Sequence, residues 1–172
     1  MNLSQFRTGT RIKKLETDLT NEMKHKFMTV ANGMVEGFVV NDDLRPKLGD
    51  ICKYFLGVDG RLNLNKGIYL KGSFGVGKTT LMMIIRKWLA DYWPNSGNGF
   101  MVTSVEDIIQ TYKMENSLDR FVGNSDDSFR PGARHLMINE FGVNLKDKIY
   151  GVESQIVITS RSEEHTSELQ SH

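Results

Sequence analysis

Residues 72–80 read GSFGVGKTT and directly follow the mostly apolar segment GIYLK at 67–71. This stretch has the form G-x-x-x-x-G-K-[ST], a phosphate-binding loop that normally joins a strand to a helix. Its glycines allow positive φ and a close approach of the backbone to a phosphate. The N-terminus of the following helix attracts the same anion. The sequence therefore predicts a P-loop between a strand at 68–71 and a helix at 78–92.

The residues of this loop have distinct predicted roles in nucleotide binding. We expect Gly72, Gly75 and Gly77 to adopt positive φ. Lys78 is expected to reach the β- and γ-phosphates, and the Thr79 hydroxyl is the expected Mg²⁺ ligand. The predicted nucleotide-binding residues are Gly72, Ser73, Phe74, Gly75, Val76, Gly77, Lys78, Thr79 and Thr80.

A second motif occurs where HLMI at 135–138 is followed by Asn139 and Glu140. A Walker B strand of a P-loop ATPase ends in Asp-Glu, in which the Asp holds the Mg²⁺ shell and the Glu polarises the attacking water. Glu140 stands in the position of that base, so we expect Glu140 and Lys78 to be catalytic. Asn139 replaces the Asp and keeps an oxygen but no charge, so metal binding through Thr79 and Asn139 should be weaker. Two other interpretations stay open, an impaired Walker B motif and an ordinary strand with a polar end.

Composition limits the class of protein. The chain has 172 residues, of which 39% are hydrophobic and 25% are charged, and its net charge is +1. This balance is typical of a globular domain and says little about partners. No apolar run reaches 18 residues, and the N-terminus lacks the apolar stretch of a secretory signal. With a single cysteine, Cys52, the sequence predicts a cytoplasmic protein without a membrane segment.

Other elements are predicted from periodicity and end signals. Apolar residues at three- and four-residue steps predict an N-terminal helix over 12–28, ended by Asn32-Gly33. A second helix should begin near Pro46 and end at Gly57. Ser104 and Asp107 form an acidic capping box that should start a further helix. The remaining predicted elements are strands at 100–103 and 135–139 and a short helix near 118–122.

The last twelve residues, RSEEHTSELQSH at 161–172, have neither helical nor strand periodicity. The string resembles the in-frame translation of a common sequencing-library adapter. We therefore expect a non-native tail over 161–172, with the natural sequence ending at about Ser160. A genuine polar tail is the alternative.

With both motifs in place, residues 46–150 resemble the helicase-loader branch of the AAA+ ATPases, the DnaC and DnaI type, together with the IstB transposition helper. The matching segments are KGIYLKGSFGVGKTTLM at 66–82, FMVTSVEDII at 100–109 and HLMINEFG at 135–142. The chain departs from the family at Asn139. It also reaches Thr159-Ser160 and then Arg161, where the sensor-1 segment usually continues with Asn. The arginine finger and sensor 2 should lie beyond Ser160.

The resemblance implies an α/β P-loop NTPase fold, an incomplete AAA+ parallel sheet flanked by helices, with a helical N-terminal segment. The implied domains are a helical segment at 1–45, a truncated ATPase core at 46–160 and the non-native tail at 161–172. In the AAA+ strand order 5-1-4-3-2, the P-loop and Walker B strands do not touch. In one interpretation the segment IVITS at 156–160 is the strand between them. In the other, residues 151–160 begin a helix.

The resemblance also implies a function. It predicts an ATP-binding protein of phage or mobile-element DNA replication that uses ATP and Mg²⁺. A replicative helicase and single-stranded DNA are the implied partners, and a homo-oligomer is a further expectation. Two alternatives remain, a nucleotide-binding switch that does not hydrolyse ATP because of Asn139, and a P-loop small-molecule kinase.

Overall fold

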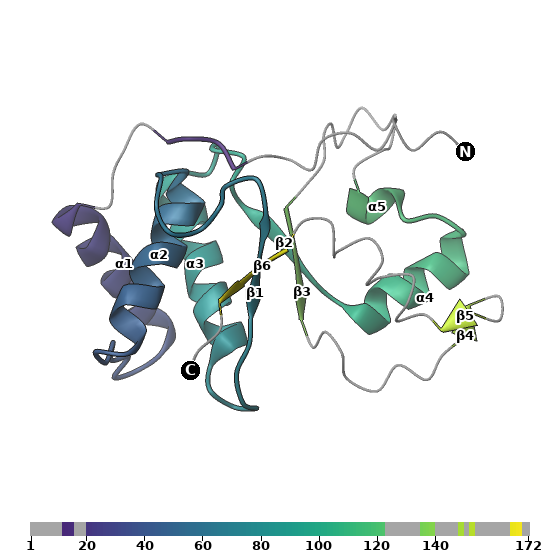
Figure 1. Ribbon diagram of the computed structural model, residues 1–172, viewed down its shortest axis with the longest axis horizontal. Helices are drawn as coiled ribbons and strands as arrows, with labels where there is room; N and C mark the ends of the chain where they lie inside the picture. The colour runs from purple at the N-terminus through teal and green to yellow at the C-terminus, as the bar shows by residue number, and fades with distance from the viewer. Residues whose placement is uncertain are drawn as a thin grey trace. The chain divides into compact units, whose positions relative to one another are not determined.

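The computed structural model describes residues 12–15, 20–122, 135–139, 148–149, 152–153 and 166–169 (Figure 1). These residues fall into two compact units. One unit contains residues 12–99 and the strand at 166–169, and the other contains the described residues from 100 to 153. The segment 156–160 lies outside the described residues, so its assignment as a strand stays a prediction. The alternative of a helix over 151–160 is not met at Val152–Glu153, which is a short strand.

The first unit is built around α3. Its elements are α1 (Asn21–Met34), α2 (Leu44–Leu56), β1 (Gly67–Leu70), α3 (Lys78–Tyr92) and β6 (Thr166–Leu169). α1 packs against α3, and the rings of Phe27 and Trp88 meet edge to face at 5.6 Å. Ile84, Ile85 and Trp88 of α3 are fully buried. The predicted bounds of α3 are thus confirmed.

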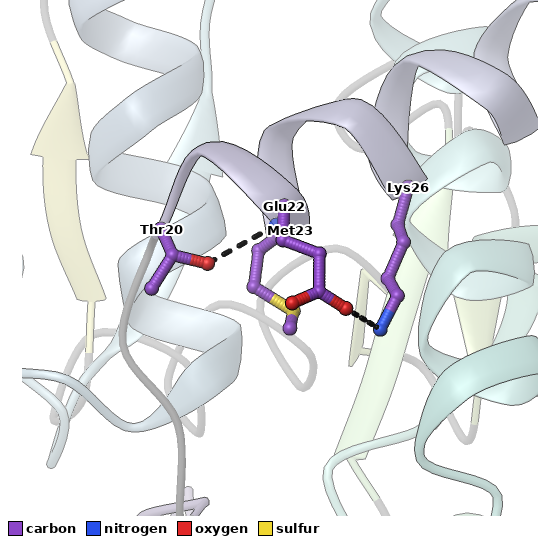
Figure 2. A network of polar contacts seen from close by, with 4 residues as sticks. All are labelled: Thr20, Glu22, Met23 and Lys26. Atoms are coloured by element: carbon purple, nitrogen blue, oxygen red, sulfur yellow. Dashed lines mark hydrogen bonds and ion pairs between the residues drawn. The ribbon is translucent and has the colours of Figure 1, made fainter.

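The expectation of a helix over residues 12–28 was wrong at its start. Residues 12–15 are not helical, and α1 begins after Thr20, whose Oγ1 accepts a hydrogen bond from Met23 N at 3.3 Å (Figure 2). An ion pair of 2.7 Å between Glu22 and Lys26 spans the first turns of α1 (Figure 2). The predicted end at Asn32-Gly33 was also early, because α1 continues to Met34. Ile12 has the apolar spacing of a helix because it is buried in this unit, and its burial does not require helical structure.

Both ends of α2 follow from local signals. Asn41 Oδ1 accepts a hydrogen bond from Leu44 N at 2.8 Å, and Pro46 lies in the first turn, where a missing N–H costs nothing. Gly57 ends the helix with φ 68°, in the left-handed region that favours glycine. The predicted start and stop are confirmed.

β1 and β6 form a parallel pair in which Gly67 aligns with Thr166 and Leu70 with Leu169. Residues 166–169 thus form a strand although the sequence of 161–172 has no strand periodicity. Ladder hydrogen bonds use main-chain groups, so a polar segment can pair with a strand edge without alternating side chains. A non-native origin of 161–172 stays a prediction.

The second unit contains β2 (Phe100–Ser104), α4 (Val105–Glu115), α5 (Asp119–Val122) and β3 (His135–Asn139), followed by β4 (Lys148–Ile149) and β5 (Val152–Glu153). β2 and β3 pair in parallel, with Phe100 opposite His135 and Ser104 opposite Asn139. β4 and β5 form a short antiparallel pair.

The predicted capping box at the start of α4 is confirmed. Ser104 Oγ accepts from Asp107 N at 3.0 Å, and Asp107 Oδ2 accepts from Ser104 N at 3.1 Å. Hydrogen bonding of the Asp107 carboxylate to the side chain and then to the main chain of Ser104 holds the pKa of Asp107 below its usual value.

The described strands form three two-stranded sheets, two of them parallel. One continuous AAA+ sheet and the domain limits at 45 and 160 stay predictions. None of the described helices is both long and apolar enough to cross a membrane.

Candidate functional site

The predicted P-loop connects β1 to α3, as the sequence pattern requires. Gly75 and Gly77 have φ of 78° and 84°, the left-handed conformation that a side chain rarely adopts. Gly77 is the N-cap of α3, and its carbonyl accepts a hydrogen bond from Leu81 N at 2.8 Å. The loop therefore ends directly at a helix N-terminus, where unpaired N–H groups and the helix dipole favour an anion.

Gly72 differs from the expectation, because its φ is not in the left-handed region. A Cβ placed on Gly72 would lie 3.4 Å from Val76 Cγ2 and 3.8 Å from Lys78 Cδ. A Cβ would thus make ordinary van der Waals contacts, so this structure requires glycine at position 72 neither for space nor for a special turn. The conformational prediction for Gly72 was therefore wrong, and positive φ within the loop is confined to Gly75 and Gly77.

Lys78 closes the loop on itself. Its ammonium donates to the carbonyl oxygen of Gly72 at 2.8 Å and to that of Ser73 at 2.7 Å. An ammonium has three N–H donors, so these two bonds leave one donor for a phosphate oxygen. Lys78 thus ties the first turn of α3 to the beginning of the loop and brings a positive charge to the helix N-terminus.

The other loop residues lie at the surface. Phe74 is fully exposed and Val76 is largely exposed, which suits positions that would serve a phosphate through main-chain N–H groups. Thr79 and Thr80 are exposed in the first turn of α3. Thr79 accordingly occupies the position that the motif assigns to the metal ligand.

Tyr54 supports the start of β1, a role that the sequence analysis did not identify. Its hydroxyl donates to the Lys66 carbonyl at 2.8 Å, and the ring packs edge to face on Phe55. Burial raises the pKa of Tyr54 above its usual value, so the phenol keeps its proton. A bond from α2 therefore holds the residue just before the strand that leads into the P-loop.

The second predicted motif lies in the other unit. Asn139 is the last residue of β3, directly opposite Ser104 of β2. Glu140 lies outside the described residues, so its catalytic role stays a prediction, as does a metal site that combines Asn139 with Thr79. The described part of the chain contains no group of three or more His, Cys, Asp or Glu residues able to hold a metal. A Mg²⁺ ion here would take most of its oxygen ligands from phosphate and water, as Mg²⁺ commonly does.

Asn98 is a second residue that the sequence analysis missed. It lies in the α3–β2 connection, which the sequence predicts only as a loop, yet its side chain is fully buried. It bonds main-chain groups of Lys13 and Phe55. A polar residue in a polar loop gives no sequence signal for such burial.

Comparisons of this chain with protein-family models, curated proteins and solved structures found no match.

Proposed function

We propose that the chain binds Mg²⁺-ATP through residues 72–80 and acts as a helicase-loader type AAA+ ATPase in DNA replication. The observation that supports nucleotide binding best is the pair of hydrogen bonds from Lys78 to Gly72 and Ser73, made at the start of α3. The left-handed Gly75 and Gly77 add support, because they let loop N–H groups converge on a phosphate. The replicative helicase, single-stranded DNA and self-association as partners rest on the family resemblance alone.

Lys78→Ala tests nucleotide binding. This change removes the positive charge and opens the tie across the loop, so affinity for a fluorescent ATP analogue should fall at least tenfold in a Mg²⁺-containing titration. Lys87→Ala is the matched control, because Lys87 lies on the same helix and makes only an exposed ion pair of 3.0 Å with Asp91. Equal affinities of wild type and Lys78→Ala would refute the P-loop assignment.

Hydrolysis is the second part of the proposal. Glu140 would position the attacking water, and Lys78 would stabilise charge on the transferred phosphate. An arginine from a neighbouring subunit typically adds roughly 10³-fold or more in rate in related phosphoryl-transfer systems. We expect turnover to be slow for the isolated chain and to rise with a partner that supplies this arginine.

A non-hydrolysing nucleotide switch is the alternative, and Asn139 at the end of β3 favours it. Asn139→Asp introduces the carboxylate that a Walker B motif normally has. A phosphate-release assay on this variant distinguishes an ATPase from a non-hydrolysing switch. An ATPase should already turn over above background and gain less than tenfold. A switch should gain at least tenfold while nucleotide affinity changes less than threefold. Asn95→Asp, an equal charge change at an exposed loop residue, should leave turnover unchanged.

A further inference from the structure

Residues 12–15 form a short segment that is neither helix nor strand, and we call it the N-terminal strap. Ile12 and Leu15 are buried, with 7% and 8% of their surfaces exposed, whereas Lys13 and Lys14 are exposed. Leu15 N donates to the carbonyl oxygen of Leu56 at 2.9 Å. The strap therefore lies along the C-terminal end of α2.

The side chain of Asn98 also binds the strap, through the main chain of Lys13. Its Oδ1 accepts from Lys13 N at 2.8 Å, and its Nδ2 donates to the oxygens of Lys13 at 2.7 Å and Phe55 at 2.8 Å. Both amide hydrogens and the oxygen of one fully buried side chain are thus used to join the strap to α2. Gly57 makes this approach possible, because a Cβ there would lie 2.3 Å from the Lys13 oxygen.

The attachment is local, and this makes separate opening feasible. The described hydrogen bonds of the strap go to one side chain, Asn98, and to one carbonyl at the end of α2. Carbonyls in the last turn of a helix have no partner within the helix and are commonly solvated. Water can therefore replace the strap there without breaking the hydrogen bonds within α2. Proteins open in such units at free energies well below that of global unfolding.

We propose that the N-terminal strap is a releasable element and that Asn98 is its clasp. Opening breaks the Leu15–Leu56 bond and the bonds between Asn98 and Lys13, while α2 and α3 stay folded. The open form exposes Ile12 and Leu15 next to two lysines. Release of the strap is thus a local opening within the first unit, and the bonds that it breaks involve no residue of the P-loop.

Native-state hydrogen exchange of the full chain tests release. The Leu15 amide should exchange at least 100-fold faster, relative to its intrinsic rate, than the buried Ile84 and Ile85 amides of α3. Its rate should also depend only weakly on low concentrations of denaturant, because little surface is exposed on opening. Equal protection and equal denaturant dependence of Leu15 and Ile85 would show one cooperative unit and overturn the proposal.

Asn98→Ala tests the clasp. It should speed exchange of the Leu15 amide at least tenfold, whereas Asn95→Ala, an exposed change in the same loop, should not alter it. Unchanged exchange at Leu15 in Asn98→Ala would show that Asn98 is not the clasp. If the alanine variant does not fold, Asn98→Asp makes the same comparison, because it keeps the oxygen and loses both N–H donors.

Discussion

Several residues in this chain make hydrogen bonds that their residue type alone does not predict. The motif alone predicts that Lys78 contacts a phosphate, and the structure adds that it binds the carbonyls of Gly72 and Ser73. Asn98 and Tyr54 could not be found from the sequence, because their partners are main-chain groups at least 12 residues away along the chain. Every residue type except proline offers the same main-chain N–H and C=O groups, so no sequence pattern reveals which of them a side chain will bind.

Cys52 illustrates a residue whose behaviour follows from burial. It is 3% exposed, and desolvation raises the pKa of its thiol from 9.0 to about 12. The thiol of the folded protein therefore keeps its proton to a higher pH than the thiol of the unfolded chain. The contribution of this group to stability is complete below pH 9 and is lost as the pH rises toward 12.

For Cys52 we expect the free energy of unfolding to fall by about 1 kcal/mol between pH 8 and pH 10 through this thiol. Urea denaturation at the two pH values measures the fall. It should be smaller by that amount in Cys52→Ala, which has no thiol to titrate. The same fall in both proteins would show that the loss of stability comes from other groups. At pH 8, a thiol reagent should label wild type only after unfolding.

At the scale of elements, the local end signals of α2 and α4 predicted helix boundaries, whereas Asn32-Gly33 placed the end of α1 too early. Gly57 and the Ser104–Asp107 box mark helix ends through their own main-chain neighbours, and both predictions hold. The strap at residues 12–15 was assigned to a helix because burial against α2 and Asn98 produces the same apolar spacing. Periodicity reports which residues are buried and cannot report what covers them.

Ser104→Ala should destabilise α4. The change removes the oxygen that accepts from Asp107 N, and loss of such a cap typically costs about 1 kcal/mol. Urea unfolding followed by far-UV circular dichroism measures the loss. Ser104→Thr retains a hydroxyl and should recover most of the stability. An alanine variant as stable as wild type would contradict a stabilising role for the box.

At the scale of the whole molecule, tryptophan fluorescence can be used to follow one of the two units separately. Both tryptophans of the chain, Trp88 and Trp93, lie in the first unit, with ring centroids 5.1 Å apart. Phe27 contacts Trp88 from α1, so this aromatic cluster ties α1 to α3. Intrinsic fluorescence therefore follows the unit that contains the P-loop. The sequence predicted β1, β2 and β3, but it predicted neither the short strands β4, β5 and β6 nor the division of the contacts near residue 100.

Phe27→Ala should destabilise the first unit by roughly 3–5 kcal/mol, because it leaves a cavity beside Trp88. Tryptophan fluorescence during urea unfolding measures the change. Phe74→Ala removes an equally large ring that is fully exposed, and it should alter stability by less than about 0.5 kcal/mol. Similar losses in the two variants would mean that Phe27 does not stabilise the core through its burial.

The tie between Lys78 and the first two loop residues has a kinetic consequence. A loop already held together needs little ordering when a ligand arrives, so capture should be a single step without a preceding slow rearrangement. The observed association rate should then grow in proportion to nucleotide concentration and not level off. Differences in affinity among nucleotides would arise mainly from how long each stays bound.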